Sequence, residues 1–544
     1  MKKVFSLIWK CDKGAFVKKL IYTALVSLLP LASLYIIKTI VDDVAVLIAS
    51  GAGDAAVQKS LCLSVALFCG ITLLCRLIST QIGINNEVLS QKLTDFINMR
   101  VQEQSVRLDM AYYDNPDYYD TLHRAQQEAA MRPIRMVESS MALFGSALSL
   151  MAVAIMILSA SYQAMLVLMV AAVPTFVVRM VKARRIYGYR RDTTPAQRRC
   201  NYYGALLTGR QYAKEVRLFG LSGYLRRLYV EGRKGLVERL LRISRHIALW
   251  DVLAALIEAA ALLAVMYFLL SSTLSATMTV GGFVMIFEAF RRGQGYMTGV
   301  VAGVSGIYEH KLFVQNLFDF LSLEPSIVSP IDAVSFPERV ESIEFDDVTF
   351  TYPGMQKAAV EHFTFTASRG VIATLKGPNG SGKTTILKLL MRFYDPQQGT
   401  IRINGIDIRR FKIDDLRHNT GAVFQDFVHF YFTAEEVVAF GDVSHELDPR
   451  RLHEALRLSG ADKVVSGLHD GLSTQLGRQF EGGEELSMGQ WQRLAMARQY
   501  YKNAQVLVFD ESAAWQDDEG RHILHQAIEE LKESHVVIVV NHEG

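Results

Sequence analysis

Six long apolar stretches before residue 310 constrain the fold of this 544-residue chain more than any other feature. A helix needs about 20 mainly apolar residues to cross the hydrocarbon core of a bilayer, and each stretch approaches or exceeds that length. A soluble helical bundle is the alternative, but it would carry more charge along runs of this length. The stretches run from Leu20 to Val41, Leu61 to Gly83, Val137 to Ser159, Tyr162 to Val181, Ile247 to Leu270 and Thr279 to Ile307.

The composition agrees with a membrane protein. Half of the residues are apolar and only 21% are charged, and the net charge of +3 gives no reason to expect a nucleic-acid partner. Three of the five cysteines, Cys62, Cys69 and Cys75, fall in one apolar run. They are therefore interpreted as small apolar residues of a helix rather than as a disulfide framework.

The sixth stretch is the least regular. Several glycines interrupt it, and it carries Glu288, Arg291 and Arg292. Charged side chains are costly in lipid, so these three are expected to face an aqueous cavity or to pair with one another. The alternative is that this end of the helix lies outside the hydrocarbon.

Lysine and arginine placement predicts the orientation. Basic residues are dense in the first 19 residues and in the segment 182–245, whereas the connections 49–58, 159–162 and 271–278 carry almost none. By the positive-inside rule, the N-terminus, the long loops and the C-terminus are cytoplasmic. The sequence thus predicts a multi-pass protein of the cytoplasmic membrane, in contact with lipid and with its C-terminal part in the cytoplasm.

Two cytoplasmic segments, about Asn85 to Arg135 and about Lys182 to His246, are too long to be simple connectors. Their apolar periodicity is helical, which favours extensions of the membrane helices into the cytoplasm. Short transverse elements are predicted at the breaks Tyr112 to Asp120 and Glu215 to Leu225.

The pattern changes after residue 310, where a proline-bearing connector precedes alternating strands that begin at Ser342. We therefore expect an all-α six-helix transmembrane domain followed by an α/β domain of the P-loop, RecA-like class. The predicted parts are an interfacial helix at 1–19, the membrane domain at 20–310, a linker at 311–341 and the soluble domain at 342–544.

A phosphate-binding loop is the strongest chemical signal. GPNGSGKTT satisfies the pattern G-x-x-x-x-G-K-[ST], with a buried-strand run before it and helical spacing after it. Glycines let backbone N–H groups approach phosphate oxygens while the helix N-terminus supplies positive potential. Lys383 is predicted to neutralise the β and γ phosphates of ATP, and Thr384 to ligate Mg²⁺. The nucleotide-binding residues predicted here are Gly377, Asn379, Gly380, Ser381, Gly382, Lys383, Thr384 and Thr385.

Two further strands bring polar residues to the same edge of the predicted sheet. VLVF ends in Asp510 and Glu511, which suit a metal carboxylate and a group that orients the attacking water. VVIVV delivers His542 to the edge where open parallel sheets bind nucleotide. Tyr352, beside Pro353, is a candidate to stack on adenine.

With these motifs in order, the chain resembles the ATP-binding cassette superfamily, of the exporter type with a fused membrane domain. ELSMGQWQRLAMAR, from Glu485 to Arg498, resembles the cassette signature of its α-helical subdomain, and VFQDF, from Val423 to Phe427, resembles the Q-loop. The resemblance extends over nearly the whole chain.

The resemblance implies roles for the matching positions. Tyr352 corresponds to the adenine-stacking residue, and Gln425 to a glutamine that senses Mg²⁺ and water. Glu511 corresponds to the general base and His542 to the switch histidine. Ser487, Gly489 and Gln490 would contact the γ-phosphate of ATP held by a second cassette, so the working unit is expected to be a dimer of half-transporters.

Three departures from the family pattern affect these expectations. Met488 stands where the family usually has glycine, and SAAWQDD replaces the usual proline-containing segment after Glu511. The sequence also ends two residues after His542, before the final strand and helices of such cassettes. A heterodimer is slightly favoured over a homodimer, since a partner with a normal signature would leave one competent site.

The expected function is ATP-driven export by alternating access. Short stretches such as FYFTAEE resemble a bacterial branch that includes lanthipeptide exporters, so the substrate is expected to be a peptide or an amphipathic small molecule. A non-transporting regulator or degenerate pseudo-ATPase is the alternative. A soluble cassette protein acting on ribosomes or nucleic acid is disfavoured by the six apolar stretches.

Overall fold

The computed structural model describes residues 2–49, 55–114, 132–160, 162–275, 277–378, 380–510 and 518–541. The chain divides into two compact units. Unit 1 comprises Met1–Gln104 and Thr121–Ser322, and unit 2 comprises Ser105–Asp120 and Leu323–Gly544. Each unit is described by itself below.

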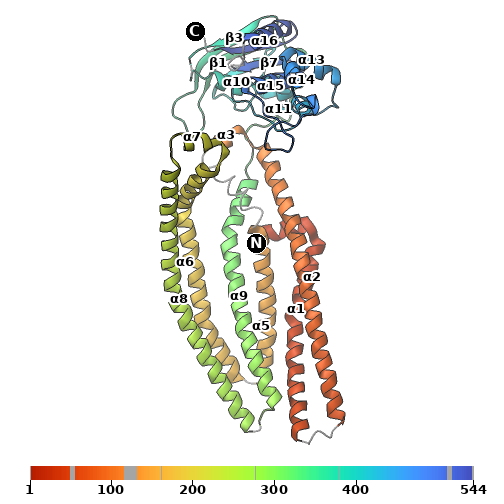
Figure 1. Ribbon diagram of the computed structural model, residues 1–544, viewed down its shortest axis with the longest axis vertical. Coiled ribbons are helices and arrows are strands. Elements are labelled where there is room, and N and C mark those ends of the chain that lie inside the picture. The colour runs from red at the N-terminus through yellow and green to blue at the C-terminus, as the bar shows by residue number, and fades with distance from the viewer. Residues whose placement is uncertain are drawn as a thin grey trace. The chain divides into compact units, whose positions relative to one another are not determined.

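Unit 1 is helical, and its main helices are very long (Figure 1). The first five predicted apolar stretches each lie inside one of them, and the sixth begins at the N-cap of α9 and continues within it. In the described part of the chain, four helical segments are apolar and long enough to cross a membrane: Phe5–Ala49, Ala55–Arg107, Pro133–Ser159 and Ser222–Leu274. The helices are α1 (Lys2–Ala49), α2 (Ala55–Arg107), α5 (Arg132–Ala160), α6 (Tyr162–Thr208), α8 (Ser222–Leu274) and α9 (Val280–Leu321), with the short η1 (Arg210–Tyr212) and α7 (Ala213–Leu218) between α6 and α8.

Glycines allow close contact between α5 and α9. A Cβ at Gly299 would lie 2.2 Å from Ser146 Oγ, one at Gly303 2.7 Å from Leu143 Cβ, and one at Gly306 2.4 Å from Ser139 Oγ. Small residues on one helix face let two backbones approach where lipid offers no hydrophobic driving force. Gly299, Gly303 and Gly306 of the sixth apolar stretch therefore lie where α9 packs closely on α5.

The charged residues of α9 pair with one another and with α1. Arg291 forms an ion pair with Glu288 at 3.0 Å, and Arg292 Nη1 donates to the carbonyl of Pro30 at 2.9 Å. The structure thus contains the predicted pairing, and whether this end of the helix lies inside or outside the hydrocarbon stays a prediction.

A break in α1 falls at Asp12, where the backbone is non-helical (φ −155°, ψ 91°). The Asp12 carboxylate accepts a hydrogen bond from the Ala15 backbone N–H at 2.9 Å and pairs with Lys92 of α2 at 2.7 Å. Asp12 therefore caps a new helix start, and the helix begun there continues through residue 19 without a second break. At the other end of unit 1, α9 extends into the segment predicted as linker.

Unit 2 contains two sheets. The first has the order β2-β1-β4-β5 and is antiparallel, and the second has the order β3-β8-β7-β6 and is parallel. The first sheet consists of β1 (Ser342–Phe350), β2 (Val360–Ser368), β4 (Gln398–Ile403) and β5 (Ile406–Asp407). The second consists of β3 (Ile372–Lys376), β6 (Thr420–Val423), β7 (Val506–Asp510) and β8 (Val536–Asn541).

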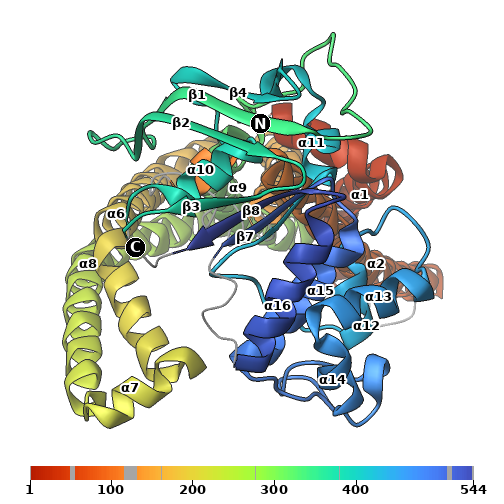
Figure 2. The same ribbon diagram turned by 90° about the horizontal axis from the view of Figure 1, so that it is seen from above.

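Helices pack on both faces of the parallel sheet (Figure 2). Val506 and Val508 of β7 join a core with α10, whereas Leu507 and Phe509 join a core with α15 and α16. This alternation follows from the two-residue period of a strand. The longer helices are α10 (Lys383–Leu390), α13 (Pro449–Ser459), α15 (Met488–Lys502) and α16 (Asp518–Leu531), and the shorter ones are α3 (Met110–Tyr113), η2 (Ile408–Arg410), α11 (Ile413–His418), α12 (Ala434–Ala439), α14 (Ala461–Ser466) and η3 (Gly471–Ser473).

Candidate nucleotide-binding site

The parallel register brings the predicted site residues to one edge of the second sheet. Lys376 at the end of β3 pairs with Asn541 of β8, and Asp510 at the end of β7 pairs with Val540. The loop after β3, the carboxylate of Asp510 and the segment after β6 that carries Gln425 therefore share the carboxyl edge. Asn379, Glu511 and His542 lie outside the described residues.

Backbone conformation explains two glycines of the loop between β3 and α10. Gly380 and Gly382 have φ of +80° and +86°, a region that side chains disfavour. At Gly382 a Cβ would also lie 2.3 Å from the carbonyl oxygen of Ala359. The loop therefore reaches the start of α10 by a path that only glycine permits.

Lys383 begins α10 and turns its ammonium back into the loop. Its Nζ donates to the carbonyls of Gly377 at 2.6 Å and Pro378 at 3.1 Å, and the residue is only 7% exposed. The ammonium has three N–H donors and is held inside the loop, so it could donate to phosphate oxygens bound there.

Thr384 and Asp510 form the candidate magnesium site. Thr384 Oγ1 donates to Asp510 Oδ2 at 3.1 Å, and Asp510 is 2% exposed. Mg²⁺ prefers one or two protein oxygens together with water and substrate phosphates. Thr384 and Asp510 could supply such protein oxygens, and the magnesium site remains a prediction.

Tyr352 is held beside the phosphate loop by aromatic contacts. Its hydroxyl lies 3.0 Å from Thr385 Oγ1, and its ring meets those of Phe350 and Tyr394 edge to face at 5.0 and 5.3 Å. The adenine-stacking role remains a prediction, but the position next to α10 is compatible with it.

Sequence reasoning missed Tyr394, which follows α10. The residue is 3% exposed, and its hydroxyl donates to the carboxylate of Asp114. Burial and this contact raise the pKa of Tyr394 far above its usual value, so the hydroxyl stays protonated. No feature of the local sequence pointed to a contact across 280 residues.

The Tyr394 contact belongs to a larger association inside unit 2. Residues 105–114, which include α3, lie with the cassette. Asp109 accepts hydrogen bonds from the backbone N–H of Ser326 at 2.6 Å and from its hydroxyl at 2.7 Å. The predicted transverse element at 112–120 therefore falls partly on a segment fixed to the cassette, while residues 115–120 lie outside the described part of the chain.

The signature residues start a helix. Ser487 caps α15, because its hydroxyl accepts from the Gln490 N–H at 3.3 Å while the Gln490 amide oxygen accepts from the Ser487 N–H at 2.9 Å. Met488 is 41% exposed and Trp491 is 2% exposed. The capped N-terminus of α15 thus carries Ser487, Gly489 and Gln490. This helix packs on the face of the parallel sheet opposite to α10, the helix that begins with Lys383.

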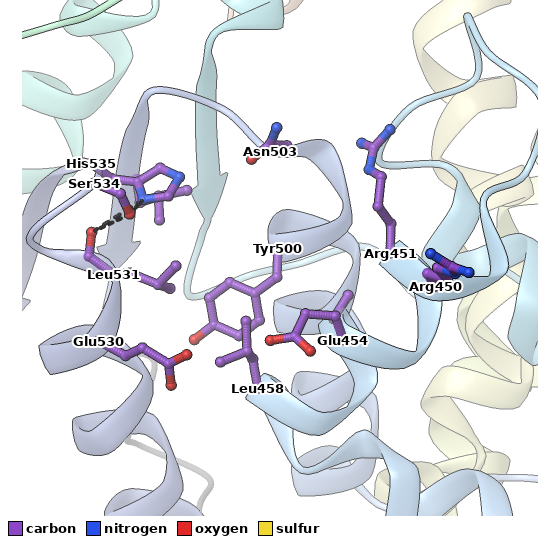
Figure 3. Close-up of a pocket in the computed structure, with 12 residues that line it drawn as sticks. Arg450, Arg451, Glu454, Leu458, Tyr500, Asn503, Glu530, Leu531, Ser534 and His535 are labelled. Atoms are coloured by element: carbon purple, nitrogen blue, oxygen red, sulfur yellow. Dashed lines mark hydrogen bonds between the residues drawn. The ribbon is translucent and has the colours of Figure 1, made fainter.

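A separate cavity of about 610 Å³ lies between α13, α15 and α16 (Figure 3). Its lining includes Asn503, just before β7, and Ser534 and His535, just before β8. These residues mark the amino ends of the strands, opposite the edge that carries the phosphate loop. The cavity is therefore distinct from the candidate nucleotide site.

Comparisons with known proteins agree with this geometry. The family profile described as ABC transporter matches residues 360–514. The subtilin transport ATP-binding protein SpaT of Bacillus subtilis is 25% identical over 545 residues, covering 100% of this chain and 87% of SpaT. The nisin transport ATP-binding protein NisT of Lactococcus lactis subsp. lactis is 22% identical over 547 residues, covering 100% of this chain and 89% of NisT.

The fold is that of a solved exporter. The structure of a bacterial Atm1-family ABC exporter with ATP bound superposes with a TM-score of 0.77 at 21% identity, over 98% of this chain and 92% of that one. The similarity spans both the helical part and the cassette. The cassette, whose residues 360–514 match the ABC transporter profile, is therefore similar to those of ABC transporters, and the whole chain has the fold of an exporter that carries a helical domain and a cassette on one polypeptide.

Proposed function

We propose that this chain is a half-transporter that uses ATP hydrolysis to export a peptide or amphipathic small molecule across the cytoplasmic membrane. The observation that carries the proposal is the juxtaposition of Lys383, Thr384 and Asp510 at the carboxyl edge of the sheet. Similarity along the whole chain to two transport ATP-binding proteins supports transport over a purely regulatory role. Since those relatives are described by subtilin and nisin, a peptide is the favoured substrate.

Each residue proposed for this edge of the sheet would have its own role in ATP hydrolysis. Thr384 and Asp510 would hold Mg²⁺, which neutralises charge on the phosphates, while Lys383 binds their oxygens. Glu511 would accept a proton from the attacking water, with Gln425 and His542 orienting the reacting groups. Tyr352 would stack on adenine.

Two cassettes would be required, because the signature residues start α15 and the phosphate loop starts α10, on opposite faces of the sheet. In the proposed dimer, Ser487, Gly489 and Gln490 of one chain would contact ATP bound by its partner. We favour a heterodimer, since Met488 places an exposed side chain beside the capped N-terminus that the partner's phosphate would approach.

Movement would pass to the membrane helices through segments such as residues 105–114. This segment continues directly from α2, and Asp109 and Asp114 fix it to the cassette. The second transverse segment, Glu215 to Leu225, includes the end of α7 and the start of α8. ATP would bring the two cassettes closer together. The conformation of the membrane helices that fits the closer spacing would then be favoured.

Glu511→Gln tests the hydrolytic assignment. The amide keeps the shape of the side chain but is a far weaker base, so ATPase activity of the purified protein should fall by about 10²-fold or more while ATP binding persists. Glu519→Gln, at an exposed glutamate of α16, is the matched control and should retain the parental rate. Unchanged hydrolysis by Glu511→Gln would show that another group is the base.

The heterodimer is tested by purifying this chain alone. We expect slow ATP turnover that rises several-fold in Met488→Gly, because removing the side chain lets backbone approach phosphate. Met355→Gly, at a residue that is 68% exposed and remote from the signature, controls for a general effect of the substitution. Fast parental turnover that Met488→Gly leaves unchanged would favour a homodimer.

A further inference from the structure

A cavity of about 450 Å³ inside unit 1 is lined by four helices, α1, α2, α5 and α9. This volume is within the range of small-molecule pockets in proteins. Most of the lining is apolar or hydroxyl-bearing, but two residues carry charge, Lys19 from α1 and Glu138 from α5. Tyr296 of α9 and Asn86 of α2 add polar groups.

Lys19 is the unusual member of this lining. The residue is only 4% exposed, yet no hydrogen bond or ion pair joins its ammonium to any residue that the structure describes. The Glu138 carboxylate attracts this charge without forming an ion pair with it, so the ammonium still lacks a direct acceptor, which buried charges normally have. Its neighbour Lys18 is exposed, so burial at position 19 is a property of the cavity and not of this basic region as a whole.

Asn86 provides a buried polar atom without a described partner in the same cavity. Its side-chain oxygen is buried and has no hydrogen-bond partner among the described residues. Buried polar atoms of this kind are uncommon in folded proteins, and this one shares the cavity with the Lys19 ammonium of another helix, which points to a ligand that contacts both. A carboxyl or similar polar end with an adjacent N–H group would satisfy both Lys19 and Asn86.

The frame around the cavity is fixed by contacts that do not use these two groups. Ser149 of α5 donates to the carbonyl of Ser27 in α1 at 2.9 Å, and Asn85 of α2 donates to the carbonyl of Ala15 at 3.1 Å. A Cβ at Gly145 would lie 2.9 Å from Ser27 Oγ, so α5 approaches α1 closely here. The cavity is therefore built by packed helices and is suited to a defined ligand.

Glu138 restricts the charge of that ligand. Its carboxylate lines the same cavity and has no ion-pair partner among the described residues. A strongly negative ligand would be repelled by it, whereas a carboxylate that carries an amino group nearby could pair with both charges.

We propose that this cavity binds the carboxylate end of an amphipathic substrate through Lys19, with Glu138 favouring a zwitterionic end. This inference rests on the proposed function, because it describes the substrate of the exporter. The apolar part of the ligand would lie against lining residues such as Val26, Ile82 and Met141.

The test measures binding by the full-length protein in phosphatidylcholine nanodiscs without nucleotide. The probes share one acyl chain: N-dodecanoylglycine carries a carboxylate, N-dodecanoylglycinamide is uncharged, and Nε-dodecanoyl-lysine has a zwitterionic end. The parental protein should bind the acid about tenfold more tightly than the amide, and the zwitterion at least as tightly as the acid. Equal affinities for acid and amide would overturn the proposal.

Substitutions test whether Lys19 causes the preference for the acid over the amide. Lys19→Gln should abolish the difference between acid and amide, Lys19→Arg should retain it, and Lys18→Gln is the matched control that should also retain it. Glu138→Gln should tighten binding of the acid relative to the zwitterion. Persistence of the acid preference in Lys19→Gln, or its loss in Lys18→Gln, would contradict the assignment.

Two additional measurements distinguish a bound lipid from a transported substrate. If phosphatidylglycerol in the nanodisc suppresses the acid preference of the parental protein, a lipid phosphate is the natural occupant and the substrate assignment is wrong. ATPase activity is measured on the same preparations. Loss of acid preference with normal ATPase counts against this inference alone, whereas preference without ATPase counts against the proposed transport function.

Discussion

Two buried lysines, one in each unit, have opposite surroundings. Lys383 of the cassette is 7% exposed and donates to two carbonyls of its own loop. Lys19 of unit 1 is 4% exposed, and none of the described residues accepts a hydrogen bond from its ammonium. The cassette thus supplies acceptors for its buried cation, whereas the helical unit leaves one to be completed from outside.

The difference extends to other charged side chains of the cassette that are buried or half-buried. Lys502 donates to the carbonyls of Arg417 at 2.7 Å and Thr420 at 2.9 Å. Asp442 accepts from the Ser444 hydroxyl at 2.6 Å and pairs with Arg451 at 3.4 Å. Such pairing satisfies groups whose isolation would cost several kcal/mol. Buried charge in the cassette is structural or catalytic, and in unit 1 it marks a candidate ligand site.

Removing Lys383 should give the largest effect. Lys383→Ala deletes the charge partner of the phosphates, and we expect ATP affinity to fall by about 100-fold, consistent with loss of charge-assisted hydrogen bonds. Lys412→Ala, at an exposed residue just before α11, is the control and should change affinity less. Direct nucleotide binding measures both, and similar losses in the two variants would place the phosphate contact elsewhere.

Replacing Lys502 of the cassette and replacing Lys19 of unit 1 should change the free energy of unfolding by different amounts. Lys502→Met leaves two carbonyls without a donor and should lower the free energy of unfolding by about 3 kcal/mol. Lys19→Met removes a buried charge that has no hydrogen bond and only the unpaired attraction of Glu138, so it should destabilise the protein much less than Lys502→Met, at the cost of ligand binding. Thermal unfolding of the full chain compares them, with exposed Lys412→Met as control. Equal destabilisation by Lys19→Met and Lys502→Met would erase the contrast between the units.

The smallest effect concerns pH. Hydrogen bonds from Ser444 lower the pKa of Asp442 to about 2 from an ordinary value near 3.8. Because the folded-state pKa is depressed, the carboxylate contributes stability above about pH 4, and this is lost as pH falls from about 4 towards 2. The contribution is about 2 kcal/mol, from roughly 1.4 kcal/mol per pKa unit.

Asp442→Asn should therefore destabilise the cassette at pH 5 and do so progressively less as the pH approaches 2. Asp414→Asn, at an exposed position of α11, controls for the loss of a surface carboxylate. Thermal midpoints of the full chain at several pH values give the measurement. A stability difference between parent and Asp442→Asn that does not vary with pH would refute the depressed pKa.

Local sequence was sufficient to predict the phosphate loop and most of the helical architecture. The loop motif specifies glycines at positions where the backbone has positive φ, as at Gly380 and Gly382, so residue identity and conformation are directly linked. The apolar stretches predict helices because a bilayer demands internally bonded backbone. The sequence predicted an interfacial helix over residues 1–19, whereas the break in α1 falls at Asp12. The Asp12 carboxylate pairs with Lys92, a residue far along the chain.

What the sequence alone determined about this protein is its class: length of apolar runs, placement of basic residues and the order of motifs predict membrane helices and a cassette before any contact is known. Tertiary structure decided the rest. The bond from Tyr394 to Asp114, the pairing of Arg292 with Pro30 and the isolation of Lys19 join residues far apart in sequence or depend on which helix faces surround them. A motif is visible in the sequence because its residues lie in one segment. The burial of a side chain and the groups that it contacts depend on how distant segments pack.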